Sequence, residues 1–338
     1  MKISILTHPL GVNYGGILQA YALSTFLQRQ GHIVNVLNRQ HDMPFIKRVM
    51  KTCLIALHHP RYYQKRYEHL QNFVRRYIPY TKPLYTSAQM KRFVLKNKSD
   101  VVIVGSDQVW RADFSMGYGF DYFLDFVPDN IKKISYAASF GLNEWKYTNK
   151  QTLKIKKLIN NYTAVSVRED EGIILCMDNL GIKAEHVLDP TMLLEAKDYE
   201  SIITPRIVKE DYVFVYWLGN KDDKQKSIIE ANVYGKKIVD ISLRGDESLM
   251  SIEDWLSYIK YADKIITDSF HGCVFSILFK KQFTICANKS GGNGRLHSLF
   301  NMLGIYNTTD RIDYSTIDSK INSWRNLSYT FIKKTLQQ

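Results

Sequence analysis

The stretch from Tyr258 to Cys286 reads YIKYADKIITDSFHGCVFSILFKKQFTIC, and it indicates the fold class. Lys264–Thr267 is a short β-rich run, Asp268-Ser269 is a polar turn, and the apolar positions of Phe270–Phe279 suit a buried helix. A strand, a tight turn and a helix in succession are typical of an α/β protein with a parallel sheet. Because open parallel sheets bind ligands at the carboxyl ends of their strands, this turn is a candidate site.

Within this turn, Ser269, His271 and Gly272 carry the functional prediction. Ser269 is placed to cap the helix, so we expect the next backbone N–H groups to face a cleft and to be able to hold an anion. His271 would lie on the first helical turn beside Gly272, which we expect to leave room for a ligand. The local pattern is equally compatible with a His271 that only caps the helix or bonds a neighbour.

Length and composition limit the remaining possibilities. A chain of 338 residues is too long for one ordinary α/β core and predicts two domains. Four scattered cysteines without CxxC spacing argue against a zinc site or a disulfide framework and favour a reducing cytosol. We expect no signal peptide, no metal site and no membrane span. The net charge of +13 favours an anionic partner: nucleic acid, a membrane surface or a phosphorylated substrate.

The first half opens as a βαβ unit. We expect a strand at Ile3–Thr7, a loop at His8–Gly16, a helix at Ile17–Gln30 and a strand at Ile33–Leu37. The turn Asn13-Tyr14-Gly15-Gly16 in this loop is not the GxGxxG of a dinucleotide site, but its glycines permit close approach of a ligand to the backbone.

Two further candidates in the first half follow predicted strands. Ser106-Asp107-Gln108 comes just after the buried strand Val101–Val104, and a tight structural turn is the alternative interpretation. Arg168 follows the strand Ala164–Val167 and precedes the acidic first turn of a helix that we expect to reach about Leu180. An intrahelical ion pair explains Arg168 as well as anion binding does.

A linker between Pro190 and Pro205 divides the chain. We expect an N-terminal Rossmann-like domain at 1–190, with a basic helical insertion at 41–80, and a C-terminal one at 191–338, ending in a helical tail. Such a pair predicts an active site in the cleft between the domains. In the second domain, Ser290–Arg295 could form a nest for an anion with Arg295 at its rim, or be a mobile surface loop.

Five blocks of sequence resemble the polysaccharide pyruvyl transferase family in their order along the chain. They are NYGGILQAYAL (Asn13–Leu23), VGSDQVWR (Val104–Arg111), SVRED (Ser166–Asp170), VLDPT (Val187–Thr191) and TDSFHG (Thr267–Gly272). The resemblance implies two Rossmann-like domains of glycosyltransferase GT-B type. It also implies transfer of a pyruvyl ketal from phosphoenolpyruvate to a sugar of a cell-surface polysaccharide, such as a capsule or exopolysaccharide.

By this resemblance, Arg168 matches an arginine of the family and His271 matches the histidine of its R-x-H block. Many members have an arginine two residues before that histidine, where this chain has Ser269. The donor's phosphate or carboxylate then needs another cation, and Arg295 is the nearest candidate in sequence. We therefore predict a donor site of Arg168, Ser269, Gly272 and Arg295.

The predicted chemistry assigns the remaining roles. Protonating the methylene carbon of phosphoenolpyruvate needs a general acid that titrates near neutral pH, which makes His271 the predicted catalytic residue. The acceptor is assigned to Asn13, Tyr14, Gly15, Ser106, Asp107 and Gln108. Phosphoenolpyruvate is a co-substrate, and no cofactor is expected. The alternatives are a GT-B-type glycosyltransferase using a nucleotide-sugar, or an inactive relative. Nucleic-acid binding lacks any recognised motif.

The segment from 45 to 80 concentrates the charge. It contains eight Lys and Arg against one acid, Glu68, a net +7 of the chain's +13. Two apolar stripes at helical spacing flank Pro60, so two helices that pack on the sheet are one interpretation. The other is a basic amphipathic hairpin on an anionic membrane. The second interpretation suits a cytoplasmic, peripheral enzyme whose acceptor is built on a lipid diphosphate.

Overall fold

The computed structural model describes residues 1–11, 13–42, 60–219, 223–233, 235–242, 250–286, 293–306, 308 and 312–338. The chain forms two compact units. The first consists of Met1–Leu193 together with Trp324–Gln338, and the second of Leu194–Ser323. The first boundary thus falls three residues after the predicted one, and the end of the chain returns to the first unit.

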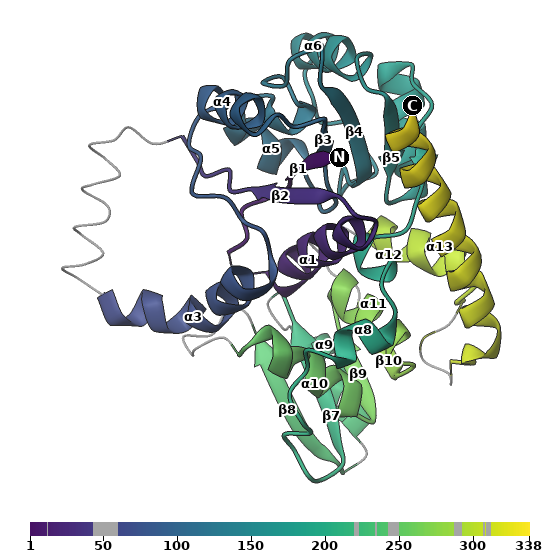
Figure 1. Ribbon diagram of the computed structural model, residues 1–338. Helices are drawn as coiled ribbons and strands as arrows, with labels where there is room; N and C mark the ends of the chain where they lie inside the picture. Colours follow the sequence, from purple (N-terminus) through teal and green to yellow (C-terminus); the bar gives the residue numbers. More distant parts are fainter. Residues whose placement is uncertain are drawn as a thin grey trace. The chain divides into compact units, whose positions relative to one another are not determined.

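The first unit is built on a parallel sheet of six strands in the order β2-β1-β3-β4-β5-β6. Figure 1 shows α1 on one face of this sheet and α4, α5 and α6 on the other. In chain order, the elements are β1 (Lys2–Leu6), α1 (Tyr14–Arg29), β2 (Ile33–Leu37), α3 (Pro60–Tyr77), α4 (Ser87–Asn97), β3 (Val101–Val104), α5 (Ala112–Ser115), η1 (Met116–Tyr118), η2 (Asp121–Phe123), β4 (Lys132–Ala138), α6 (Asn149–Ile159), β5 (Ala164–Val167), α7 (Asp170–Leu175), η3 (Cys176–Leu180), β6 (Glu185–His186) and η4 (Pro190–Met192).

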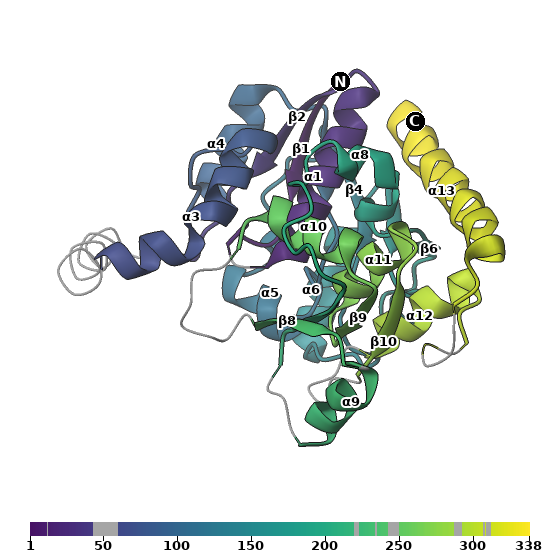
Figure 2. The same cartoon turned by 90° about the horizontal axis from the view of Figure 1, so that it is seen from below.

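The second unit has a parallel sheet of four strands in the order β10-β9-β7-β8. In Figure 2, α10 and α11 lie on one side of this sheet and α9 on the other. Its elements are α8 (Ala196–Glu200), β7 (Tyr212–Trp217), α9 (Asp223–Val233), β8 (Lys237–Ser242), α10 (Ile252–Tyr261), β9 (Lys264–Thr267), α11 (Phe270–Leu278), β10 (Gln282–Ile285), α12 (Asn293–Leu303) and the start of α13 (Tyr314–Gln337). Both units are therefore doubly wound α/β folds, as predicted.

The helix α1 begins three residues earlier than the sequence pattern indicates. Asn13 is its N-cap and accepts a hydrogen bond from the Gly16 N–H at 3.2 Å, so the expected turn is the first turn of the helix. Tyr14 is fully buried there, and this burial outweighs the low helix propensity of the two glycines that follow it.

The C-terminal part of α13 packs on the first unit through polar contacts with η4 and the loop after β6. The Arg325 Nε–H donates to the Met192 carbonyl at 3.0 Å, and the Ser328 hydroxyl accepts from the Leu188 N–H at 3.0 Å. The ring of Tyr329 stacks on Phe26 of α1 at 4.9 Å. These contacts explain why the tail that we predicted to close the second domain belongs to the first unit. None of the described helices is both long and apolar enough to cross a membrane.

The basic segment from 45 to 80 is described only in part, since 43–59 lie outside the described residues. Of its second stripe, Leu70 and Val74 are buried on α3. The ring of Tyr77, also on this stripe, meets Tyr21 of α1 edge-on at 6.1 Å. Leu70, Val74 and Tyr77 therefore pack against the protein, as the interpretation of packed helices predicts for this part of the stripe.

Gly272 does not leave the space that we expected for a ligand. A Cβ at this position would lie 2.6 Å from the Thr267 Oγ1 and 3.1 Å from its Cγ2. Thr267 is the last residue of β9 and fully buried, and its hydroxyl accepts a hydrogen bond from the Ser269 N–H at 3.0 Å. The glycine therefore allows α11 to pack closely on the strand that precedes it.

We expect Gly272→Ala to destabilise the second unit by about 1–3 kcal/mol, because the added methyl overpacks a buried contact. Chemical denaturation followed by circular dichroism measures this loss. Gly11→Ala is the control, since a Cβ at Gly11 would meet only the Pro9 carbonyl, at 4.0 Å. Removing the Thr267 side chain as well should make the two losses less than additive. Full additivity would contradict the proposed overlap.

Candidate functional site

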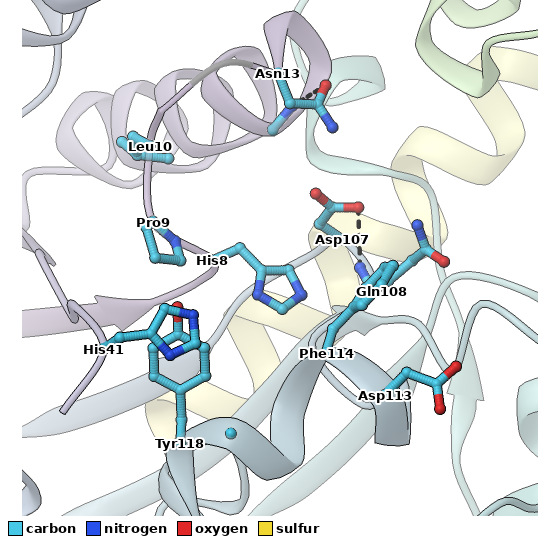
Figure 3. Close-up of a pocket in the computed structure, with 12 residues that line it drawn as sticks. His8, Pro9, Leu10, Asn13, His41, Asp107, Gln108, Asp113, Phe114 and Tyr118 are labelled. Carbon is cyan, nitrogen blue, oxygen red and sulfur yellow. Dashed lines mark hydrogen bonds between the residues drawn. The ribbon is translucent and has the colours of Figure 1, made fainter. Parts of the chain in front are cut away.

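A cavity of about 400 Å³ opens at the carboxyl edge of the first sheet (Figure 3). Its walls come from the loop after β1, the start of α1 and the loop after β3. The strand β1 has β2 as its neighbour on one side and β3 on the other, so the order of the strands reverses between β1 and β3. The cavity lies at this topological switch point, where such sheets bind ligands. The described lining residues are His8, Pro9, Leu10, Asn13, Gly16, His41, Asp107, Gln108, Asp113, Phe114, Gly117 and Tyr118.

Asp107 is held in the cavity wall by an uncommon backbone conformation. Its φ is +80°, in the left-handed region that few residues other than glycine adopt. Its carbonyl accepts from the N–H groups of Val109 at 2.7 Å and of Ser139 at 3.1 Å, and its Oδ1 accepts from the Gln108 N–H at 2.9 Å. Strained positions of this kind gather at functional sites, because the surroundings must hold them in place.

The opposite wall of the cavity is aromatic. The ring of His41 stacks on Tyr118 at 4.1 Å, and the Arg39 guanidinium lies 5.3 Å from the same Tyr118 ring. Arg39 is buried and its Nε–H donates to the Asp121 carboxylate at 2.6 Å, which fixes the start of η2 to the end of β2. This wall therefore presents a preorganised aromatic surface to a ligand.

The chemical character of the lining indicates what the cavity can bind. The twelve described lining residues include two carboxylates, two imidazoles, the side-chain amides of Asn13 and Gln108, and aromatic rings. They include neither lysine nor arginine. Carboxylates accept hydrogen bonds from hydroxyl groups, and amides both accept and donate them, whereas carboxylates repel phosphates. The cavity is thus suited to a neutral polyhydroxyl ligand.

Behind the cavity, Arg168 joins several strand ends in a buried network. Its Nη1–H groups donate to the Asp189 Oδ2 at 2.8 Å and to the Ser106 hydroxyl at 3.4 Å, and its Nη2 lies 3.9 Å from the Asp107 Oδ1. Burial lowers the pKa of the Arg168 guanidinium. The negative charges of Asp189, Glu169 and Asp107 together raise it by more, so the net shift of the pKa is upward. The guanidinium therefore stays charged in the interior.

The main partner of Arg168 is not one of the acidic residues that follow it in the sequence, as the intrahelical ion pair would require. Its closest ion pair is to Asp189 in the VLDPT block, and its Nε lies 3.8 Å from the Glu169 carboxylate. Asp189 also accepts from the Ser106 hydroxyl at 2.9 Å and from the Thr191 hydroxyl at 2.7 Å. The carboxylate thus connects the ends of β3, β5 and β6. Its place in the VLDPT block, directly after the apolar pair Val187-Leu188, is the signal that could have identified it.

The structure separates the predicted acceptor residues into two groups. Asn13, Asp107 and Gln108 line the cavity. Tyr14 and Gly15 are buried in the first turn of α1, and Ser106 is buried in the Arg168 network. Sequence reasoning missed the lining residues His8, His41, Phe114 and Tyr118. Only His8 carried a signal, because it follows directly on the first strand.

The second unit repeats this arrangement at its own switch point, between β7 and β9. The Asp268 carboxylate accepts from the N–H groups of Leu218 at 2.7 Å and Gly219 at 3.0 Å, which joins the two strand ends. Ser269 is the N-cap of α11, as predicted, and accepts from the Gly272 N–H at 3.2 Å. His271 follows on the first turn and is 6% exposed.

Arg295 lies near this turn, although not on a loop. It belongs to the first turn of α12, and its guanidinium lies 6.0 Å from the centre of the Phe270 ring. Half of the predicted anion nest Ser290–Arg295, at 290–292, lies outside the described residues. Arg295 thus lies close to Phe270, the first residue of α11, and its predicted role as the donor's cation stays a prediction.

A model of the polysaccharide pyruvyl transferase family matches residues 13–290, most of the chain. The chain belongs to the polysaccharide pyruvyl transferase family. The match spans all five sequence blocks of this pyruvyl transferase homologue, and it includes β7 and β9, which flank the switch point of the second unit. No curated protein is significantly similar to it in sequence. Within the described part of the chain, no group of three or more His, Cys, Asp or Glu side chains is arranged to hold a metal ion.

Solved structures support the fold of this pyruvyl transferase family member. The UDP-GlcNAc 2-epimerase from Neisseria meningitidis, bound to UDP-GlcNAc, is 12% identical with a TM-score of 0.52, and 100% of each chain is covered. A putative UDP-N-acetylglucosamine 2-epimerase from Listeria monocytogenes is 9% identical with a TM-score of 0.51, covering 99% of this chain and 96% of the other. At such low identity the likeness shows the fold alone, which is GT-B-like as predicted.

We expect Asp189→Asn to destabilise the first unit by about 3 kcal/mol or more, because it removes one partner of a buried ion pair and leaves the Arg168 charge poorly compensated. Chemical denaturation measures the loss. Asp125→Asn is the matched control, since the Lys154–Asp125 pair is exposed and should contribute less than about 1 kcal/mol. Equal losses in the two variants would show that the buried junction is not a major source of stability.

Proposed function

We propose that this protein transfers a pyruvyl group from phosphoenolpyruvate to a sugar, as a ketal, during synthesis of a cell-surface polysaccharide such as a capsule or exopolysaccharide. The observation that carries the proposal is the family match together with the position of its blocks. The TDSFHG and VGSDQVWR blocks fall at the switch points of the two sheets, where doubly wound folds bind ligands.

The donor is assigned to the second unit. Phosphoenolpyruvate carries a phosphate and a carboxylate, and the start of α11 and Arg295 together offer a helix N-terminus and a guanidinium. His271, on the first turn of α11, would protonate the methylene carbon as the general acid. Arg168 remains a predicted donor ligand, and binding of the donor would require its guanidinium to share its charge with Asp189.

The acceptor is assigned to the cavity of the first unit. Its lining of carboxylates, amides and aromatic rings without lysine or arginine favours a sugar ring over the anionic donor. Asn13, Asp107 and Gln108 would hold the hydroxyl groups, and the Tyr118–His41 stack would lie against the ring. The natural acceptor that we propose is linked to a lipid diphosphate, which places the enzyme in the cytoplasm at the inner face of the membrane.

Release of inorganic phosphate from phosphoenolpyruvate tests this function directly. A panel of p-nitrophenyl hexosides and N-acetylhexosaminides serves as acceptors, and mass spectrometry detects the ketal product. The same acceptors incubated with UDP-sugars test the alternative of a glycosyltransferase through release of UDP. Phosphate release that depends on the acceptor supports the proposal, whereas UDP release without phosphate release would overturn it.

We expect His271→Asn to lower turnover by about 10²-fold or more while leaving the fold intact, because asparagine can keep a hydrogen bond but cannot donate the proton. The matched control is His297→Asn, which changes an exposed histidine on α12 and should leave turnover unchanged. Steady-state phosphate release and circular dichroism check both points. Near wild-type turnover in His271→Asn would show that His271 is not the general acid.

We expect Arg295→Ala chiefly to raise the KM for phosphoenolpyruvate, because it removes a cation from the donor site. Arg295→Lys should restore little of the loss if the guanidinium binds the donor with two hydrogen bonds. Arg92→Ala, on the exposed surface of α4, is the control for loss of one positive charge. An unchanged KM for phosphoenolpyruvate in Arg295→Ala would show that other groups bind the donor. The assignment of His271 as the general acid would not be affected.

A further inference from the structure

His8 is the histidine that the first unit places in the wall of the cavity directly after β1. Its ring meets Tyr122 edge-on at 5.0 Å and Phe114 edge-on at 6.1 Å, so two aromatic side chains fix its orientation. Figure 3 shows it between the Tyr118–His41 stack and the Asp107–Gln108 segment. Among the described residues its Nε2 has no hydrogen-bond partner, although the atom is buried.

The other titratable groups around the cavity are less suited to accept a proton. Asp107 receives the Gln108 N–H and lies 3.9 Å from the Arg168 guanidinium, and both interactions stabilise its charged form. Asp113 lies 3.5 Å from Arg111, and its side chain is 62% exposed. Both carboxylates therefore already have a guanidinium as a neighbour.

The remaining groups are excluded by their packing. His41 lies flat against Tyr118 and is exposed to solvent. Burial raises the pKa of Tyr118, and it raises the pKa of Tyr122 well above the ordinary value, so neither phenol is ionised near neutral pH. The Arg111 guanidinium, 4.5 Å from the Phe114 ring, remains a cation and cannot accept a proton. Of the two imidazoles among the described lining residues, His8 is the one packed between aromatic side chains away from bulk solvent, with a buried Nε2 that has no hydrogen-bond partner.

We infer that His8 is the general base that takes the proton from the attacking hydroxyl of the sugar. The inference rests on the proposed function, and it assigns a catalytic role to a residue outside the five sequence blocks. An imidazole is the side chain best matched to this task near neutral pH. A hydroxyl bound by Asp107 and Gln108 at the same edge of the sheet would lie beside the His8 ring.

The hydroxyl oxygen forms a bond to C2 of phosphoenolpyruvate as its proton moves to His8, and the methylene carbon takes a proton from the general acid to become a methyl group. Phosphate then leaves with the electron pair of its C–O bond, and the second hydroxyl closes the ketal. The two sugar hydroxyls lose two protons in total. One of these is balanced by the proton that the methyl group gains, and the other leaves with inorganic phosphate.

His8→Gln separates proton transfer from sugar binding. We expect kcat to fall by about 10²-fold with little change in the acceptor KM, because glutamine can hold a hydroxyl but cannot accept its proton. We also expect the fall in wild-type activity at low pH to be lost in the variant. His69→Gln, at an exposed position on α3, is the control and should behave as wild type.

His8→Ala with added imidazole gives an independent readout. Free imidazole should restore part of the phosphate release, since it can enter the space left by the side chain and accept the proton. The assay uses phosphoenolpyruvate and the p-nitrophenyl glycoside that the wild type accepts best. Unchanged kcat in His8→Gln, or a raised acceptor KM with the acidic limb intact and no rescue by imidazole, would overturn the role of His8 alone. A wild-type protein that releases no phosphate with any acceptor would instead overturn the proposed function, and this inference with it.

Discussion

The ion pair between Arg168 and Asp189 is the interaction on which the first unit's functional edge depends. A lone buried guanidinium would be very unfavourable, so Arg168 requires a carboxylate at close range, and Asp189 provides it at 2.8 Å. The remaining oxygen capacity of Asp189 binds Ser106 and Thr191. One buried charge pair therefore fixes the carboxyl ends of β3, β5 and β6 relative to one another, and the cavity wall at Asp107 begins at the residue after Ser106.

This junction also explains how a non-glycine residue is maintained at a positive φ. The strain at Asp107 persists because its carbonyl, its carboxylate and the preceding Ser106 are each held by separate partners. Gly16 contributes from the other side, since a Cβ there would lie 3.4 Å from the Asp107 carboxylate. The start of α1 and the end of β3 can therefore approach closely, and the cavity between them is shaped before any ligand arrives.

Much of the fold follows from sequence pattern, because buried parallel strands are continuous apolar runs with polar residues at their ends. Val101–Val104 and Lys264–Thr267 were predicted to the residue, and the turns that follow them contain Asp107 and His271. Tertiary packing was not predictable in the same way. No local pattern indicates that Tyr14 is buried or that Gly272 packs against Thr267. The partner of Arg168 was missed because Asp189 is 21 residues away, whereas sequence reasoning compares neighbours.

The distribution of charge separates the two ligand-binding edges more clearly than the net charge does. The chain carries +13, yet no lysine or arginine is among the described residues lining the first cavity. Exposed lysines instead lie on outer helices such as α6, which carries Lys150, Lys154 and Lys157. Under the proposed function, a lysine or arginine among these lining residues would attract the anionic donor in place of the sugar, since a charge in a partly enclosed cavity is poorly screened. Under the proposed function, a cavity without lysine or arginine among its described lining residues would favour the sugar, and a helix N-terminus with Arg295 would favour the anionic donor.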